Sequence, residues 1–278
     1  MHVIRAACAG ACYGVQRALD LALDEAGSPG KTQTLGPLIH NPQVVSRLHD
    51  MGVGVAHSAE DIDADCIIIR SHGVTPEVMR QVEATGSRIV NATCPHVMRA
   101  QHAAARLAKE CGTVLVVGES SHPEVEGLVA HAREAGGNVA VVNAVEDIPE
   151  DLDQPVGVVV QTTQSRAKFD CIVDHLHTRK CDLKVIDTIC DATSQRQDAA
   201  AQLAAKVDAM VVIGGRNSSN TTRLYEICSG ISPRSFHIET PGELQKELFD
   251  GCATVGVTAG ASTPEDQIRA VEELLESW

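Results

Sequence analysis

Three cysteines occupy the same place in three similar stretches of the sequence. Each follows a short run of β-branched residues and directly precedes, or lies within a few residues of, an alanine-rich segment with helical spacing. They are Cys12, Cys94 and Cys190. The N-terminus of a helix favours the thiolate, which is the form that binds metal or attacks electrophiles. Soft thiolates select zinc or iron-sulfur clusters, and three of them leave one coordination position open, as in catalytic metal sites.

The chain has ten cysteines in total, and seven of them lie outside this pattern. We interpret these as core or surface thiols: Cys8, Cys66, Cys111, Cys171, Cys181, Cys228 and Cys252. Cys8 requires separate attention because it stands four residues before Cys12. If it completed a closed four-thiolate site, the protein would be a structural or sensing metal protein instead of an enzyme.

Polar turns follow six of the apolar, strand-like runs. Turns that open helices attract anions, because the unpaired N–H groups and the helix dipole both favour negative charge. The polar residues in these turns supply many hydrogen-bond donors without lysine or arginine, so we expect a phosphate or diphosphate site. Its candidate residues are His40, His72, His122, Thr162, Ser218, Ser219, Asn220 and Ser262. For any one of them, helix capping or a structural role is the simpler interpretation.

Glu124 follows His122 in the stretch SHPEVEG. A carboxyl enclosed near an anion and a metal centre should have a raised pKa, which suits it to proton delivery. An ordinary preference for acids in the first helical turn is the alternative. Thr162, in QTTQS, could relay a proton or orient a water molecule.

Strand-like and helix-like segments alternate along the whole sequence, which predicts an α/β fold with parallel sheets. We predict three pseudo-symmetric α/β units, each a small, largely parallel sheet flanked by helices. Their expected ranges are 12–94, 95–190 and 191–278, with the N-terminal strand 1–11 completing the third. A cyclic arrangement around a central iron-sulfur cluster would bring the three cysteines together.

Composition narrows the possible functions further. The formal net charge is −14, which disfavours binding to nucleic acid. The apolar runs are too short to span a membrane and the N-terminus lacks a signal pattern, so we expect a cytoplasmic protein. Aromatic residues make up only 2% of the chain, which predicts an aliphatic core. Few aromatic side chains are available to stack on a flat ring, so binding of a flavin or a nucleotide is disfavoured.

A series of motifs covering nearly the whole chain resembles one family, the LytB/IspH family of 4-hydroxy-3-methylbut-2-enyl diphosphate reductases. The matching stretches, in the order expected for the family, are GACYGVQRA, HNPQVV, SHGV, ATCP, HPEVEG, QTT, SQRQ, NSSN and GVTAGAS. The resemblance implies the last step of the non-mevalonate pathway of isoprenoid biosynthesis. In that step the allylic alcohol is reductively dehydroxylated to isopentenyl and dimethylallyl diphosphates.

The resemblance also implies a cofactor and a role for each matching residue. Cys12, Cys94 and Cys190 would hold one 4Fe-4S cluster, with one iron not bound by a protein side chain. Glu124 would deliver protons, and Thr162 would help to position the hydroxyl group. Electrons would come from a donor such as ferredoxin or flavodoxin. The diphosphate would be held by His40, His72, His122, Ser218, Ser219, Asn220 and Ser262.

Two positions depart from the family pattern, and two alternative functions stay open. Tyr13 replaces a small residue after the first cysteine, and CAGAC replaces a Pro-Arg-Gly approach, which introduces Cys8. Either change could alter substrate choice or cluster reactivity. The alternatives are a related cluster enzyme acting on another allylic or phosphorylated substrate, and a non-catalytic protein that binds metal or phosphate.

Overall fold

The protein contains three four-stranded sheets, and every strand pair in them is parallel. The computed structural model describes all of residues 1–278. By its internal contacts the chain divides into two compact units. The terminal unit comprises residues 1–15, 40–44 and 191–278, and the central unit comprises residues 16–39 and 45–190. Each unit is described separately.

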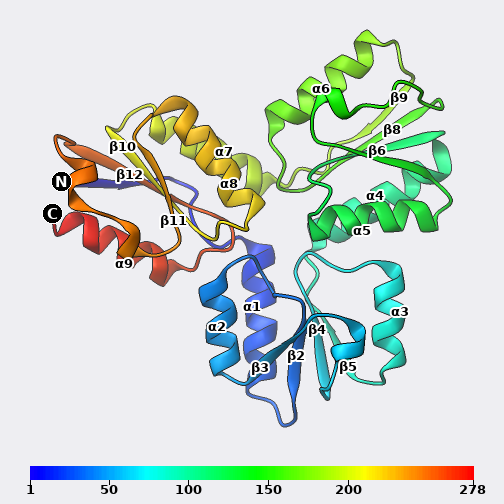
Figure 1. Cartoon of the computed structure of the whole chain (residues 1–278), viewed down its shortest axis with the longest axis horizontal. Helices are drawn as coiled ribbons and strands as arrows, with labels where there is room; N and C mark the ends of the chain where they lie inside the picture. The colour runs from blue at the N-terminus through cyan, green and yellow to red at the C-terminus, as the bar shows by residue number, and fades with distance from the viewer. The chain divides into compact units, whose positions relative to one another are not determined.

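The terminal unit contains one sheet with the order β1-β12-β10-β11. Its strands are β1 (His2–Arg5), β10 (Ala209–Ile213), β11 (Ser235–Ile238) and β12 (Thr254–Ala259). The N-terminal strand therefore lies beside a strand from the other end of the sequence, with Val3 opposite Val255. Both chain ends lie in this unit (Figure 1).

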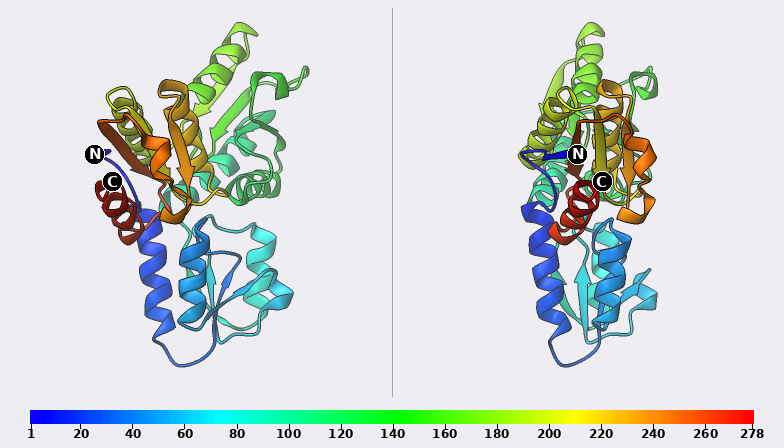
Figure 2. Two further views of the ribbon diagram at one scale, coloured as in Figure 1. Left: turned by 60° about the vertical axis from the view of Figure 1, so that its left-hand side comes forward. Right: turned by 90° about the vertical axis from the view of Figure 1, so that its left-hand side faces the viewer.

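Helices cover both faces of this terminal sheet (Figure 2). Ile268 and Val271 of α9 (Glu265–Glu276) pack on one face with Val211 and Val257. The other face packs against α7 (Asp191–Ala204) and α8 (Ser219–Ile231) through residues such as Leu203. The short 3-10 helices η3 (Pro241–Glu243) and η4 (Lys246–Phe249) connect β11 to β12.

The central unit contains the other two sheets. The first has the order β3-β2-β4-β5, formed by β2 (Thr32–Leu35), β3 (Val53–Ala56), β4 (Cys66–Ile69) and β5 (Arg88–Asn91). Val82 of α3 (Pro76–Ala84) packs on one face. The 3-10 helix η1 (Ala59–Asp61) also lies in this unit, as do most of α1 (Tyr13–Ala26) and most of α2 (Pro42–Asp50). The first residues of α1 and α2, up to Val15 and Val44, belong to the terminal unit.

The second sheet of the central unit has the order β7-β6-β8-β9. Its strands are β6 (Thr113–Val117), β7 (Asn138–Val142), β8 (Val156–Val160) and β9 (Leu183–Ile186). Every residue of β6 and β8 is buried, as expected for inner strands of a parallel sheet covered on both faces. One face packs on α4 (Pro95–Glu110) and α5 (Pro123–Glu134), the other on α6 (Arg166–Thr178); η2 (Val145–Asp147) follows β7.

The same order of strands recurs in all three sheets. In each sheet, the strand that comes before a predicted ligand cysteine lies at one edge and pairs with a single inner strand. These pairs are β1 with β12, β5 with β4, and β9 with β8. The predicted α/β fold with three parallel sheets and flanking helices is confirmed. The cyclic arrangement and the predicted unit boundaries at residues 94 and 190 stay predictions.

Candidate active site

All three predicted ligand cysteines stand at helix N-termini. Cys94 is the N-cap of α4, and Cys12 and Cys190 immediately precede the first residues of α1 and α7. All three are half-buried, and none is in a disulfide. The first N–H groups of a helix have no partner within the helix, and their partial positive charge favours the thiolate form of a nearby cysteine.

A backbone hydrogen bond ties each of these cysteines to a polar turn of its own sheet. The amide of Cys12 donates to the carbonyl of Ala261 at 3.2 Å, that of Cys94 to Ser71 at 2.9 Å, and that of Cys190 to Thr162 at 3.1 Å. Each acceptor lies two residues beyond the end of the neighbouring strand, β12, β4 or β8. The bonds therefore extend the parallel pairing past the strand ends and place each thiol beside a candidate substrate-binding turn.

Three of the other cysteines have raised pKa values. Desolvation raises the pKa of Cys66, with a further contribution from the charge of Glu25, and desolvation also raises the pKa of Cys111. Burial raises the pKa of Cys228 to about 12. Raised values keep these thiols protonated, which supports their interpretation as structural residues.

Glu124 lies in the first turn of α5 with its carboxyl group fully enclosed. The residue is 2% exposed, and burial raises its pKa to about 7 although both bonds from Thr162 lower it. The Thr162 amide donates to Oε1 at 2.6 Å, and the Thr162 hydroxyl donates to Oε2 at 2.9 Å. The structure thus joins two residues that the sequence placed in different motifs, and gives the acid a pKa suited to proton transfer near neutral pH.

His122, the N-cap of α5, has a defined ring orientation. Its Nδ1 accepts the Glu124 amide N–H at 3.1 Å. Because Nδ1 is an acceptor in this bond, the proton of the neutral ring lies on Nε2, which is left as a donor. The ring of His72 packs edge-on against it with 5.5 Å between the ring centroids. Two predicted anion ligands of the central unit are therefore neighbours.

Two candidate residues of the terminal unit, His40 and Ser262, are connected through Asn41, which the sequence prediction omitted. The Asn41 side chain caps α2 by accepting the amide N–H groups of Gln43 and Val44, and it donates to the carbonyl of Ser262 at 2.9 Å. The Ser262 hydroxyl donates in turn to the carbonyl of His40 at 3.1 Å. Asn41 thereby holds the His40 segment and the Ser262 turn together.

Ser218, Ser219 and Asn220 form the N-terminal turn of α8. The Ser218 side chain caps the helix by accepting the amide of Thr221 at 3.3 Å. Asn220 is 4% exposed, and neither its Nδ2 nor its Oδ1 has a hydrogen-bond partner within the protein. A buried amide without a hydrogen-bond partner lowers the stability of the protein, so this side chain is a candidate to bind a polar group of a ligand.

The donor set suits an iron-sulfur cluster. It consists of three thiols at helix N-termini, none of them in a disulfide. Soft thiolates are the usual ligands of iron-sulfur clusters.

Asn41 and Gln161 are the site-forming residues that the sequence analysis missed. Asn41 did carry a local signal, because Asn before Pro is a common helix start and HNPQ has that form. Gln161 is 1% exposed; its Oε1 accepts the Glu119 amide and its Nε2 donates to Thr163. Its role depends on the adjacency of β6 and β8, for which no local signal exists.

Comparison with known proteins identifies the family. The model of the family described as LytB protein matches residues 3–276. The chain belongs to this family. It is known as a family of iron-sulfur enzymes, which agrees with the three thiols at helix N-termini.

Relatives match over nearly their full length. The 4-hydroxy-3-methylbut-2-enyl diphosphate reductase of Trichlorobacter lovleyi is 47% identical, with 95% of this chain and 94% of the relative covered. A solved structure described as (E)-4-hydroxy-3-methyl-but-2-enyl diphosphate reductase, the terminal enzyme of the non-mevalonate pathway, is 43% identical. It covers all of both chains with a TM-score of 0.72.

A more distant structure supports the fold alone. The E-1-hydroxy-2-methyl-but-2-enyl-4-diphosphate reductase of Plasmodium falciparum is 24% identical and has a TM-score of 0.91, covering 99% of this chain and 87% of its own. None of the helices of this chain combines the length and the apolar composition that a membrane span requires.

Proposed function

We propose that this chain reductively dehydroxylates 4-hydroxy-3-methylbut-2-enyl diphosphate to isopentenyl and dimethylallyl diphosphates, the last step of the non-mevalonate pathway. Two electrons and two protons enter, the C–O bond of the allylic alcohol breaks, and the oxygen leaves as water. Family membership and relatives named for this activity support the proposal. Within the structure, the fully buried pair of Glu124 and Thr162 is the observation that carries it.

The three helix-terminal cysteines are the proposed ligands of a 4Fe-4S cluster. Cys12, Cys94 and Cys190 bind it, and one iron has no protein ligand. When bound, the cluster supplies the electrons and a Lewis-acidic position for the hydroxyl oxygen of the substrate. The three backbone tethers are the contribution of the chain, because they fix each cysteine relative to a substrate-binding turn.

The diphosphate is held without lysine or arginine. His72 and His122 present ring donors in the central unit, and the terminal unit contributes His40, Ser262 and the N-terminal turn of α8. Asn220 has an amide with no internal partner, so it can donate to a phosphate oxygen without breaking a bond in the protein. The remaining donors of this turn are the side chains of Ser218 and Ser219.

Proton delivery follows the bond between Glu124 and Thr162. With a pKa of about 7, the carboxyl group holds a proton in much of the population near neutral pH. When Oε2 carries the proton, the carboxyl group can donate it to Oγ1 of Thr162 along the 2.9 Å contact, while Thr162 passes its own hydroxyl proton towards the substrate. Enclosure excludes bulk water from the carboxyl group, so the proton reaches the substrate through Thr162.

The proposed electron donor is a ferredoxin or flavodoxin, and the proposed location is the cytoplasm. Neither nucleic acid nor a membrane takes part in the proposed reaction. None of the ten cysteines is in a disulfide, which suits a reducing compartment.

Anaerobic turnover tests the proposed function. The iron-loaded chain is supplied with the allylic diphosphate and an artificial reductant, and the two product diphosphates are measured. We expect turnover in the wild type and a loss of about 10² to 10⁴-fold in Glu124→Gln with substrate binding retained. Loaded wild-type protein that binds the substrate and leaves it unconverted would refute the proposal.

A further inference from the structure

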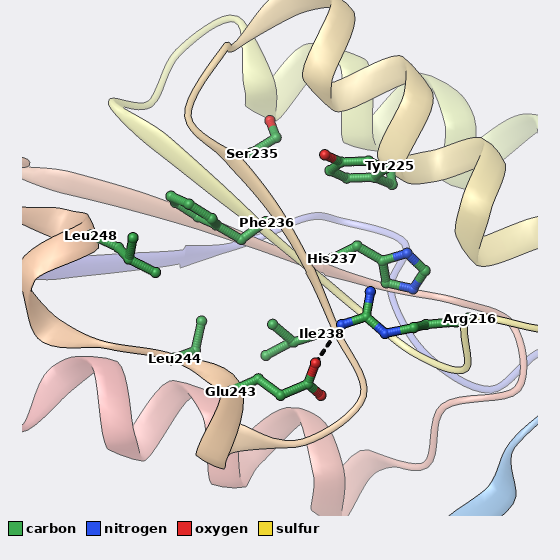
Figure 3. A pocket seen from close by; sticks show the side chains of 9 residues that line it. All are labelled: Arg216, Tyr225, Ser235, Phe236, His237, Ile238, Glu243, Leu244 and Leu248. Carbon is green, nitrogen blue, oxygen red and sulfur yellow. Dashed lines mark hydrogen bonds and ion pairs between the residues drawn. The ribbon is translucent and has the colours of Figure 1, made fainter.

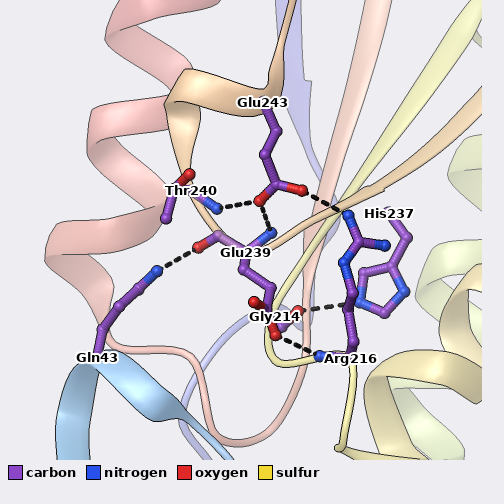
Figure 4. A network of polar contacts seen from close by, with 7 residues as sticks. All are labelled: Gln43, Gly214, Arg216, His237, Glu239, Thr240 and Glu243. Carbon is purple, nitrogen blue, oxygen red and sulfur yellow. Dashed lines mark hydrogen bonds and ion pairs between the residues drawn. The ribbon is translucent and has the colours of Figure 1, made fainter. Parts of the chain in front are cut away.

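A polar network in the terminal unit connects two helix starts that carry proposed diphosphate ligands. Glu239 directly follows the edge strand β11, and three bonds converge on it (Figure 4). Its Oε1 accepts the backbone amide of Arg216 at 2.7 Å, in the turn between β10 and α8. Its carbonyl oxygen accepts from Nε2 of Gln43 at 2.7 Å, in the first turn of α2.

Glu243 fixes Glu239 in turn. Its Oε1 accepts the amides of Glu239 at 2.7 Å and Thr240 at 2.9 Å, and its Oε2 pairs with the guanidinium of Arg216 at 2.5 Å. The amide bonds follow a pattern present in all three sheets, since Asp61 and Asp147 close the corresponding 3-10 turns in the same way. The link from Glu243 to Arg216 is the additional element here.

The two connected segments approach each other closely at His40. A Cβ atom added to Gly215 would lie 2.7 Å from the His40 carbonyl oxygen, which the Ser262 hydroxyl also contacts. The turn therefore passes against the backbone of His40, and a small displacement of either segment would alter the distance between His40 and Ser218. Asn220, whose buried side-chain amide has no hydrogen-bond partner within the protein, follows in the first turn of α8.

The ion pair in this network is exposed, whereas Glu239 is half-buried. The side chains of Arg216 and Glu243 are 58% and 33% exposed. Arg216 borders a cavity of about 280 Å³, together with His237 and Phe236 (Figure 3). An ion pair open to water in this way contributes little to stability, so within this network Glu239 is what holds the turn at Arg216. The same turn is also contacted at the Gly214 carbonyl, where His237 Nε2 lies 2.9 Å from the oxygen.

In the other two sheets, the residue at the position of Glu239 is not a carboxylate that binds a backbone amide of the preceding turn. The residues that follow β3 and β7 are His57 and Asn143. Asn143 instead accepts from Gln164, in the turn after β8. A carboxylate that accepts the amide of the preceding turn is therefore particular to the unit that carries Ser218 and Asn220.

We propose that Glu239 is a positioning residue for diphosphate binding: it fixes the turn before α8 relative to the N-terminus of α2. This inference rests on the proposed function, because it names how two sets of proposed ligands acquire their spacing. Glu239 does not touch the substrate. Its loss should weaken diphosphate binding and leave the proton-transfer step, which occurs at Glu124, unchanged.

Substitutions on the loaded protein test this proposal, with inorganic diphosphate as the calorimetric probe and with KM and kcat for the allylic substrate. Glu239→Ala should weaken diphosphate binding and raise KM about fivefold, with kcat within about twofold of wild type. Glu239→Gln should restore most of the affinity, because its amide oxygen can still accept from Arg216. Glu247→Ala, an exposed acid of η4, is the matched control and should behave as wild type.

Gln43→Ala provides a second test that leaves Glu239 in place. It removes the other arm of the network and should weaken diphosphate binding about threefold. Hydrogen exchange at residues 216–220 should accelerate in Glu239→Ala and not in Glu247→Ala. If both Glu239→Ala and Gln43→Ala bind diphosphate as tightly as wild type, the positioning role is wrong and the proposed function stands. If wild type itself neither binds diphosphate nor converts the substrate, the proposed function fails, and this inference with it.

Discussion

At the scale of single residues, Glu124 is the candidate proton donor, and its carboxyl group is fully buried. Its pKa rises because the ionised carboxylate loses solvation, and the two bonds from Thr162 recover only part of that loss. The acid form is therefore retained at pH values where an exposed glutamate would be ionised. An acid tuned in this way can donate a proton and be reprotonated within one catalytic cycle.

The pH dependence of kcat should report this residue. The protonated carboxyl is the active form, so kcat should be constant at lower pH and fall above about pH 7, approaching a tenfold loss per pH unit. Steady-state rates from pH 5.5 to 9 in the loaded enzyme would measure it. The residual rate of Glu124→Gln should lack this alkaline limb; an unchanged limb in that variant would assign it to another group.

Asn220 should show opposite effects on stability and on binding. Its amide is buried without a partner, so Asn220→Ala removes a desolvation penalty of about 1–2 kcal/mol, partly offset by the lost packing. We expect an unfolding free energy equal to or above that of wild type, together with diphosphate binding weakened about tenfold. Denaturant titration and calorimetry would measure the two quantities. Lower stability with unchanged binding would contradict the assignment.

The sequence was sufficient to propose most of the candidate site residues and insufficient to pair them. Glu124 and the cysteines stand beside recognisable helix starts. The contact between Glu124 and Thr162 depends on β6 lying beside β8, with Val117 opposite Val160, which is a tertiary feature. Glu239 shows the same limit more strongly, since only the pairing of β10 with β11 brings it to Arg216. Asn41 was recognisable as a helix cap, but its bond to Ser262 was not predictable.

At the scale of elements, the amide of each candidate ligand cysteine is hydrogen-bonded to one candidate substrate-binding turn. The amides of Cys94 and Cys190 extend the pairing of β5 with β4 and of β9 with β8. The sequence predicted parallel sheets because strand-like and helix-like segments alternate along it. Their lateral order was not readable from that pattern, and the tethers depend on it.

Loading the cysteines with iron and sulfide should therefore order the turns. We expect slower hydrogen exchange at the amides of Cys94 and Cys190 and in residues 71–73 and 162–164 of the loaded protein than in the iron-free protein. The far end of α4, near Cys111, should exchange alike in both. Equal exchange in the turns of loaded and iron-free protein would show that metal binding and the turns are independent.

At the scale of the whole molecule, three sheets with one strand order repeat the same device with different side chains. The turns after the inner strands β4, β8 and β12 contain His72, Thr162 and Ser262, respectively. In each turn a backbone carbonyl accepts a cysteine amide: it belongs to Thr162 itself in one turn and to the residue before His72 or Ser262 in the other two. Repetition of the scaffold explains how residues from distant parts of the sequence acquire equivalent positions. Differences among the repeats, such as Glu124 and Glu239, supply the separate roles.

The iron and sulfide content of cysteine variants tests the central claim most directly. After anaerobic reconstitution we predict about four irons and four sulfides per chain in wild type and in Cys8→Ser, which removes the thiol nearest in sequence to Cys12. Cys12→Ser, Cys94→Ser and Cys190→Ser should each lose most of the iron. Full iron content in any of these three variants, or its loss in Cys8→Ser, would contradict ligation by three cysteines with one open position.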